Sequence, residues 1–362
     1  MSTTAEGAGV KRRDFLKILG ATGASTAVVG CSSEQVGKLI PYVSNPDQTV
    51  AGESNFYAST CRECATGCGV LVKVSDGRPI KIDGNPDHPL SKGAICSTGL
   101  SALQGLYNPD RYRGPMMRQG NALKPVTWDA ALQTLAQKLG EVRSKGTAGN
   151  ALFINQHESG SFPGFLDAWL AGYGMPAHLS VDAEADHATM EANRRAYGVA
   201  SPALDFDAAS LVVSFGADFL DNWGAGVPNS LAWADARAKV EGAPRLVYIG
   251  PRRSLTGLNA DQWIATKAGS EHMVAQALAG AAGKGGSVTI AQAAEAAGVK
   301  PEVLDALARE IAAAGNKVMA ICGHATTDAV ACGVSVAEIN KAVGSVGVTI
   351  KPAEADVGYA GL

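Results

Sequence analysis

The sequence predicts an α/β protein in which a small β-rich N-terminal domain precedes Rossmann-like parallel α/β lobes. Short apolar runs rich in Val and Ile alternate with longer helical stretches, which is typical of a parallel sheet covered on both faces. The 43 glycines and the 6% content of aromatic residues fit tightly connected α/β layers better than an all-β sandwich. A length of 362 residues leaves room for two lobes and a leader.

Apolar periodicity predicts where the elements lie. Two strands within residues 70–82 are expected to form a hairpin around the turn Ser75-Asp76-Gly77. The strands expected in the α/β lobes are residues 151–154, 211–215, 245–249 and 317–321. The helices expected between them are residues 127–144, 161–173, 185–197, 228–241, 270–282 and 301–314.

We expect five segments along the chain. They are a leader (1–33), a linker (34–50), a small cysteine-containing domain (51–115), an α/β domain (116–282) and a second, partial α/β segment (283–362). The Ala/Gly-rich stretch 283–300 is expected to form a flexible boundary between the last two.

Charge and cysteine usage exclude some classes of function. The net charge is −3 and no basic block follows the leader, so we expect no nucleic-acid partner. The seven cysteines do not suggest a disulfide framework, which is typical of shorter secreted chains. Cys322 and Cys332 are expected to pack as small apolar side chains.

The first residues have the features of an export signal. Arg12 and Arg13 precede an apolar stretch, residues 18–29, that is shorter than the roughly 20 residues needed to span a bilayer. The pattern resembles a twin-arginine signal, which exports folded, cofactor-loaded proteins, although Lys11 stands where Ser or Thr is usual. The alternative is an amphipathic N-terminal tail. The expected location is the periplasmic side of the cytoplasmic membrane.

The sequence Val28-Val29-Gly30-Cys31 resembles a lipoprotein cleavage site. Processing there would leave Cys31 as a lipidated first residue, and several acyl chains on it would anchor the protein stably. The alternative is that Cys31 is removed with the leader.

Four cysteines form the strongest motif. Cys61, Cys64, Cys68 and Cys96 have the spacing C-x2-C-x3-C-x27-C. Three closely spaced thiolates and one remote thiolate suit a [4Fe–4S] cluster. Structural zinc sites commonly use two C-x2-C pairs, and the second pair is missing here, so zinc and no metal remain the alternatives. His88 is expected to lie in an exposed turn and not to be a ligand.

The cysteine spacing, the segment GRPIKIDGNPDHP and the segment LYNPDRYRGPM together resemble the N-terminal part of the molybdopterin oxidoreductases of the bis-molybdopterin-guanine-dinucleotide type. The resemblance continues through Thr127-Trp128-Asp129, with Thr127 a plausible N-cap, and through the strand 245–252. It implies a truncated form of that family's architecture. Residues 51–115 would be its iron–sulfur domain and residues 116–282 its α/β domain.

A narrower resemblance involves LIPYV at residues 39–43, YASTCRECATGCG, and SFGADFLDNW at residues 214–223. These segments are similar to the molybdopterin-like part of the B subunits of bacterial alternative complex III and of the related quinone reductase complex. The resemblance implies a quinol-oxidising membrane assembly. Its partners would be a ferredoxin-like iron–sulfur subunit, a multihaem cytochrome c and an integral-membrane quinone-binding subunit. It also implies that the molybdenum site is lost.

Departures from the catalytic members favour this loss. The stretch 178–198 offers no cysteine or selenocysteine for molybdenum, and Asp186 is the one credible substitute ligand. The alternative is that Asp182, Glu184 and Asp186 are solvated charges at a helix start. No basic residue follows Cys96, and the catalytic relatives are about twice this length. Molybdopterin guanine dinucleotide is therefore expected to be absent. Residual nucleotide binding at Gly216, Asp218, Pro251 and Arg252 is a further alternative.

The sequence thus predicts an electron-transfer or scaffold subunit, and leaves open whether it catalyses a reaction of its own. Two other functions remain. One is a self-sufficient molybdopterin-dependent reductase with Asp186 on the metal. The other is a zinc-stabilised interaction protein.

Overall fold

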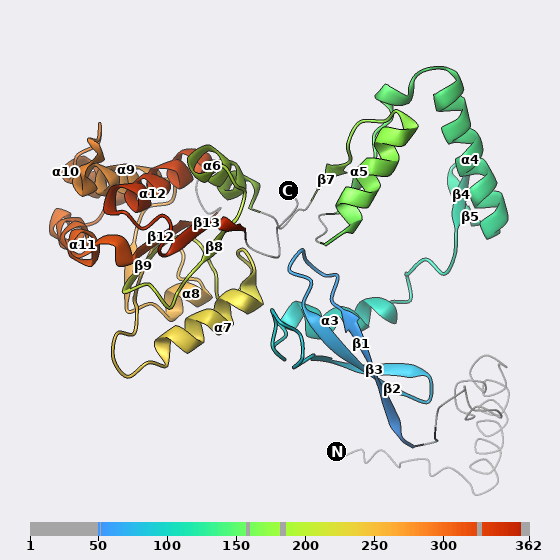
Figure 1. Ribbon diagram of the computed structural model, residues 1–362, viewed down its shortest axis with the longest axis horizontal. Helices are drawn as coiled ribbons and strands as arrows, with labels where there is room; N and C mark the ends of the chain where they lie inside the picture. The colour runs from blue at the N-terminus through green and yellow to red at the C-terminus, as the bar shows by residue number, and fades with distance from the viewer. Residues whose placement is uncertain (1–49, 51, 157–159, 182–185, 324–327, 356–362) are drawn as a thin grey trace, which may run out of the picture. The chain divides into compact units, whose positions relative to one another are not determined.

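A computed structural model describes residues 50, 52–156, 160–181, 186–323 and 328–355 (Figure 1). The predicted leader and linker, with Arg12, Arg13 and Cys31, lie outside the described residues. The chain forms two compact units, residues 1–57 with 73–80 and residues 58–72 with 81–362. Within the described part, no helix is both long and apolar enough to cross a membrane.

The N-terminal strands β1 (Ser54–Thr60), β2 (Gly69–Ser75) and β3 (Arg78–Gly84) form one sheet in that order. The predicted hairpin is confirmed: Asp76 and Gly77 both have positive φ, 48° and 74°, which is the backbone of a type I′ turn. In the first unit, the Lys73 ammonium lies 6.0 Å from the centre of the Phe56 ring. Helix α3 (Ser97–Leu106) follows β3 in the chain.

Residues 116–181 carry two small sheets and two helices. Strands β4 (Met116–Gln119) and β5 (Ala122–Pro125) form an antiparallel hairpin. Helix α4 (Trp128–Ser144) begins after Thr127, whose hydroxyl accepts a hydrogen bond from the Ala130 amide at 3.3 Å, so the predicted N-cap is confirmed. Strand β6 (Ile154–Asn155) precedes helix α5 (Phe162–Tyr173) in the chain, and strand β7 (Leu179–Ser180) follows it. The two strands pair with each other in parallel.

The main sheet has four parallel strands in the order β11-β10-β9-β12. Their bounds are β9 (Leu211–Phe215), β10 (Arg245–Gly250), β11 (Gln262–Ala265) and β12 (Val318–Cys322). Every residue of β9 and β12 is buried, as expected for strands covered on both faces. The predicted α/β fold class is confirmed.

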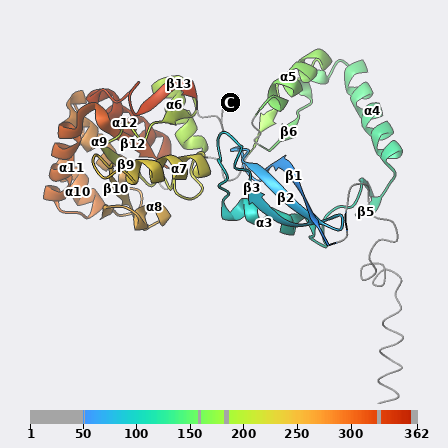
Figure 2. The ribbon, with the colours of Figure 1, turned by 60° about the horizontal axis from the view of Figure 1, so that its bottom comes forward.

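Helices cover both faces of this sheet (Figures 1 and 2), and each face has its own apolar core. One core contains residues of α9 (Glu271–Ala279), α10 (Ile290–Ala297), α11 (Pro301–Ala314) and α12 (Ala329–Val343). The other contains residues of α7 (Gly226–Arg237). In this second core Phe206, Phe219 and Trp233 form an aromatic cluster with ring centres 5.1–5.9 Å apart. The short helix α8 (Leu255–Leu258) follows β10.

Residues on both sides of the predicted boundary at 282–283 contribute to one apolar core and one sheet. Helix α10 lies inside the predicted flexible stretch, yet Ala293, Ala294 and Ala297 are buried in the first core. Strand β12 pairs with β9, so the predicted partial segment 283–362 completes the main sheet. The small size of the alanines and glycines explains why this stretch packs in the core although it was expected to be flexible. A Cβ added at Gly280 would lie 3.2 Å from the backbone of Gly286, so glycines permit a close backbone approach.

Strand β12 is an edge strand, and a side chain of helix α12 forms hydrogen bonds with its backbone at Ala320. The Asn340 amide of α12 accepts from the Ala320 N–H at 2.9 Å and donates to the Ala320 carbonyl at 2.8 Å. It also donates to the Tyr197 hydroxyl at 3.0 Å. Tyr197 ends α6 (His187–Tyr197), and the antiparallel pair β8 (Pro202–Leu204) and β13 (Ile350–Ala355) completes this lobe.

Replacing Asn340 by Leu should destabilise the fold strongly. The substitution leaves a buried N–H and a buried carbonyl without partners, and each such group costs about 1–3 kcal/mol. We expect chemical denaturation of Asn340→Leu to show a free energy of unfolding lower by about 3 kcal/mol. The matched control is Glu338→Gln, an exposed position on the same helix, which should be neutral. Equal stability of both variants would contradict this role of Asn340.

Candidate functional site

The structure brings the four predicted cysteines to one place. Cys61 follows β1, Cys64 and Cys68 lie in the loop before β2, and Cys96 is the N-cap of α3. All four side chains line the same hollow. Among the residues that the structure describes, no three Cys, His, Asp or Glu side chains meet as closely as the ligands of a single metal ion.

Backbone contacts shape the loop 61–68. The Cys61 amide donates to the Cys68 carbonyl at 2.8 Å and closes the loop. Gly67 has φ 63°, a left-handed conformation that glycine adopts without strain. A Cβ at Gly69 would lie 2.5 Å from the His88 ring, so this position must stay glycine. His88 is half-buried, not exposed as predicted, and its Nδ1 lies 3.1 Å from the Ser91 hydroxyl.

The remote cysteine lies at a helix start. The Cys96 sulfur accepts a hydrogen bond from the Gly99 amide at 3.4 Å. A Cβ at Gly99 would lie 2.7 Å from the Ile95 side chain, so glycine is needed there, and 3.5 Å from the Cys61 sulfur, so this helix turn lies next to a second cysteine. The Gly99 amide thus points at the sulfur of a predicted cluster ligand.

Burial raises the pKa of two of the four thiols. It raises the pKa of Cys68 to about 12, with further increases from Cys64, Cys61 and Cys96 nearby. Burial also raises the pKa of Cys61. Without a bound cation these thiols therefore keep their protons at neutral pH, and metal binding would release them. Four clustered sulfur donors with an amide donor and a helix N-terminus fit a [4Fe–4S] cluster.

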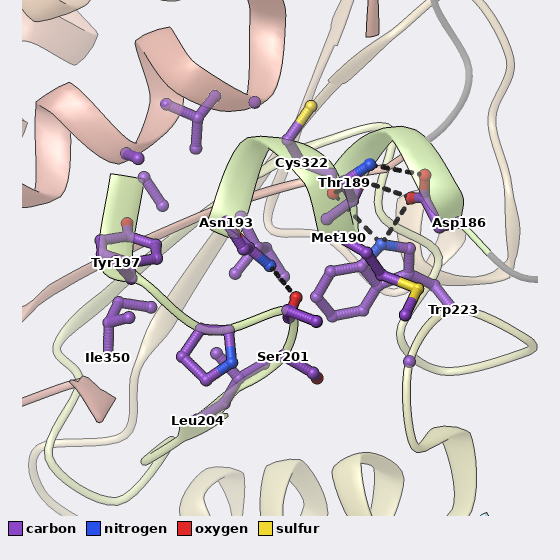
Figure 3. Close-up of a pocket in the computed structure, with 18 residues that line it drawn as sticks. Asp186, Thr189, Met190, Asn193, Tyr197, Ser201, Leu204, Trp223, Cys322 and Ile350 are labelled. Carbon is purple, nitrogen blue, oxygen red and sulfur yellow. Dashed lines mark hydrogen bonds between the residues drawn. The ribbon is translucent and has the colours of Figure 1, made fainter. Parts of the chain in front are cut away.

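Asp186 has a structural role at the start of α6 (Figure 3). Its Oδ1 accepts from the Thr189 amide at 3.1 Å, and its Oδ2 accepts from the Thr189 hydroxyl and from the Trp223 indole N–H. Asp186 is half-buried and not a solvated charge. Asp182 and Glu184 lie outside the described residues. A metal at Asp186 would have to share the carboxylate with these three hydrogen bonds.

Trp223 links three segments at this point. Its indole N–H, which donates to Asp186, also lies 3.1 Å from the Cys322 carbonyl oxygen. The Thr189 hydroxyl lies 2.9 Å from the same carbonyl oxygen. The indole thus joins the start of α6, the end of β12 and the loop before α7. Sequence reasoning missed Thr189 and Trp223, because these partners are far apart in the chain and follow no motif.

A cavity of about 50 Å³ extends from Asp186 beneath α6. Its walls come from α6, α12, β12, β8 and β13, with mainly apolar side chains such as Met190, Leu204 and Ile350 (Figure 3). The volume is sufficient for a few water molecules. The cavity is formed by segments far apart in the sequence, so no local pattern predicts it.

The carboxyl ends of β9 and β10 hold the four predicted nucleotide-contact residues. Asp218 is buried and accepts from the Thr256 amide at 2.8 Å, and the Arg252 guanidinium lies 3.9 Å from it. A Cβ at Gly323 would lie 2.4 Å from the Gly216 carbonyl oxygen. This close approach requires glycine at position 323, and the left-handed backbone of Gly216, with φ 72°, suits glycine. Asp218 is already hydrogen-bonded within the fold.

Cys322 and Cys332 are buried in the first core, as expected of small apolar side chains. Their sulfurs lie 3.4 Å apart.

Comparisons with known proteins agree with this architecture. Residues 54–108 match the molybdopterin oxidoreductase Fe4S4 domain, which supports a 4Fe–4S cluster, and residues 111–349 match the molybdopterin oxidoreductase domain. The molybdopterin-binding-like subunit of menaquinone reductase from Nitratidesulfovibrio vulgaris is 30% identical over 274 residues, which are 74% of this chain and 39% of that protein. A sulfite dehydrogenase chain from Allochromatium vinosum is 27% identical, over 62% of this chain and 23% of its own length.

Acetylene hydratase from Pelobacter acetylenicus has the same fold at a TM-score of 0.64 and 18% identity, covering 81% of this chain and 44% of the hydratase. The chain thus spans less than half the length of these relatives. Because the larger domain match alone covers more than half of the sequence, this chain belongs to the molybdopterin oxidoreductase family.

Proposed function

We propose that this chain is an iron–sulfur electron-transfer subunit of a periplasm-facing, quinol-oxidising respiratory complex. The observation that carries the proposal is the hollow lined by Cys61, Cys64, Cys68 and Cys96 in a segment that matches the Fe4S4 domain. When bound, the cluster supplies a centre that accepts and returns one electron. The menaquinone reductase subunit from N. vulgaris supports a role in quinone chemistry.

The chain's own residues would hold and tune this centre. The bond from the Cys61 amide to the Cys68 carbonyl fixes the loop that carries three of the sulfurs. The Gly99 amide donates to the Cys96 sulfur, and hydrogen bonds to ligand sulfurs raise the reduction potential of iron–sulfur centres. Burial of Cys68 limits the access of water on one side.

Loss of molybdenum chemistry is part of the proposal. The Asp186 carboxylate is occupied by Thr189 and Trp223, and Ser97, Thr98 and Gly99 follow Cys96 without a basic residue. The expected partners are a ferredoxin-like iron–sulfur subunit, a multihaem cytochrome c and an integral-membrane quinone-binding subunit. The twin-arginine-like leader supports a location on the periplasmic side of the membrane, with Cys31 as a lipid anchor.

Anaerobically purified protein should contain about four iron and four sulfide ions per chain. Dithionite should reduce this cluster and produce an EPR signal, because an electron-transfer centre must change its oxidation state. Cys68→Ala should lose the iron, whereas Cys332→Ala should keep it, since Cys332 lies in the core of the α/β lobe. Stoichiometric zinc in place of iron would overturn the proposal in favour of an interaction protein.

Asp186→Ala should affect stability and not metal content. Removing an N-cap carboxylate costs about 1 kcal/mol, and the Trp223 N–H also loses an acceptor. We expect a lower free energy of unfolding, with no molybdenum or tungsten in either wild type or variant by elemental analysis. Stoichiometric molybdenum that disappears in Asp186→Ala would instead support the self-sufficient reductase.

Replacing Arg12 and Arg13 by Lys should block export. The twin-arginine route depends on the arginine pair, so cell fractionation should find the double variant in the cytoplasm. The variant Cys31→Ala should still be exported. Its mass should be lower than that of the wild-type protein, because it carries no acyl chains. Export of the double-Lys variant at the wild-type level would refute the signal.

A further inference from the structure

Two buried cysteines outside the cluster site lie side by side in the α/β lobe. Cys322 is the last residue of β12, and Cys332 is the fourth residue of α12. Their side chains are 4% and 0% exposed and belong to the first core. The Cys322 thiol donates to the Cys332 sulfur, and the two sulfurs lie 3.4 Å apart. The sulfurs of a disulfide lie about 2.05 Å apart, so a small side-chain movement separates this dithiol from a disulfide.

The end of β12 at Cys322 is held by the segments around it. Its carbonyl oxygen accepts hydrogen bonds from the Thr189 hydroxyl and the Trp223 indole N–H (Figure 3). The Gly323 amide, one residue further along, donates to the Phe215 carbonyl at 2.9 Å. One member of the sulfur pair is therefore fixed to α6, to the loop before α7 and to β9.

The start of α12 has no side-chain cap among the described residues. Asp328 is the N-cap, but its carboxylate accepts no hydrogen bond from the first turn. The carboxylate lies instead 3.9 Å from the His272 Nε2. In α4 and α10, by contrast, a threonine hydroxyl caps the first turn. A covalent bond at Cys332 supplies an anchor at the end of α12 where this cap is missing.

We propose that Cys322 and Cys332 form an intramolecular disulfide that fastens the first turn of α12 to the end of β12. The oxidant is an organic disulfide. A thiolate of one cysteine attacks it, forms a mixed disulfide and releases one thiol. The second thiolate then attacks the mixed disulfide and releases the other thiol. Two electrons and the two thiol protons thus pass from the cysteine pair to the oxidant, which leaves as two thiols.

The surroundings of Cys322 make this exchange slow. Its hydrogen bond to Cys332 and its burial hold the pKa of Cys322 well above the ordinary range, and the charges of Asp186 and Glu271 raise it further. Only the thiolate attacks a disulfide, so at neutral pH we expect the pair to react over hours. The same burial shields the finished bond from thiols in solution.

A disulfide here stabilises the lobe chiefly through the unfolded chain, because it closes a loop between residues 322 and 332. Helix α12 also carries Asn340, whose amide binds the backbone of Ala320 in β12. The disulfide and the Asn340 amide therefore join the same strand and helix at two points. The periplasmic side of the membrane is an oxidising compartment, in which such a bond persists. Only this last point rests on the proposed function.

Peptide mapping of the full-length holoprotein tests the proposal. The protein is reduced, freed of reductant and incubated anaerobically with oxidised glutathione, and the remaining thiols are then alkylated in denaturant. Trypsin releases both cysteines in one peptide, 318–341, because no Lys or Arg lies between Lys317 and Lys341. We expect this peptide to carry no label and to be two hydrogens lighter than the dithiol. Dithiothreitol should restore both alkylation sites.

Two alkyl labels on peptide 318–341 after the incubation, or glutathione retained on either cysteine, would overturn the proposal. The control is Cys332→Ala, in which Cys322 has no second thiol beside it, so its peptide should carry one label or one glutathione. Iron is measured in the same samples. An unoxidised pair in protein with a full cluster contradicts this inference alone, whereas a missing cluster bears only on the proposed function.

Thermal unfolding provides the second measurement. The oxidised wild type should melt roughly 5 °C above the reduced form, because the disulfide restricts the unfolded chain. Cys332→Ala should melt at the same temperature under both conditions, since it cannot form the bond. An oxidised wild type that melts no higher than the reduced form would show that the bond does not fasten α12, and would overturn the proposal.

Discussion

A parallel sheet is stable only when both faces are covered and its edge peptide groups find partners. Within the described chain, the main sheet meets this requirement on both faces and at Ala320 of its β12 edge. Its two cores cover the faces, and the Asn340 amide binds the edge strand at Ala320. The β6–β7 pair does not meet it, because its apolar residues are exposed and Asn155 lacks partners among the described residues. The same constraint distinguishes the covered main sheet from the small β6–β7 pair.

The cysteine site follows a different constraint. Burial favours protonated thiols, as the raised pKa of Cys68 shows, whereas a cluster requires thiolates. At the start of α3, the Gly99 amide donates a hydrogen bond to the Cys96 sulfur. The glycines at positions 67, 69 and 99 carry no side chain where the loop and the helix turn are tightest. Local backbone geometry therefore prepares the site before any cation binds.

Much of this architecture was predictable from local sequence. The buried strands 211–215, 245–249 and 317–321 are continuous apolar runs, and helix 301–314 has a clear apolar period, so the strands were located to within one residue and the helix without error. Helix α12 was missed because its residues are apolar or small on most sides, which hides the period. Helix α10 was missed because alanines and glycines were interpreted as a flexible stretch, although they permit close packing in the core.

The candidate site was predictable only where ligands follow a spacing. The cysteines have such a spacing and were identified from it. The bonds among Asp186, Thr189 and Trp223 were not predictable, because Trp223 lies 37 residues beyond Asp186 and the shared Cys322 carbonyl lies 133 residues beyond Thr189. The opposite helix faces of α5 illustrate the same limit, since sequence shows that both are apolar but not which one is covered.

The capping role of Asp186 has an evolutionary consequence. In a lineage that works without molybdenum, as proposed for this chain, a carboxylate at this position becomes necessary for the start of α6 and for its junction with Trp223. Any substitution that returned a metal ligand there would first weaken the fold. Regaining a molybdenum ligand at this position would then need a compensating substitution elsewhere. The packing at this junction would therefore oppose a return to molybdenum chemistry.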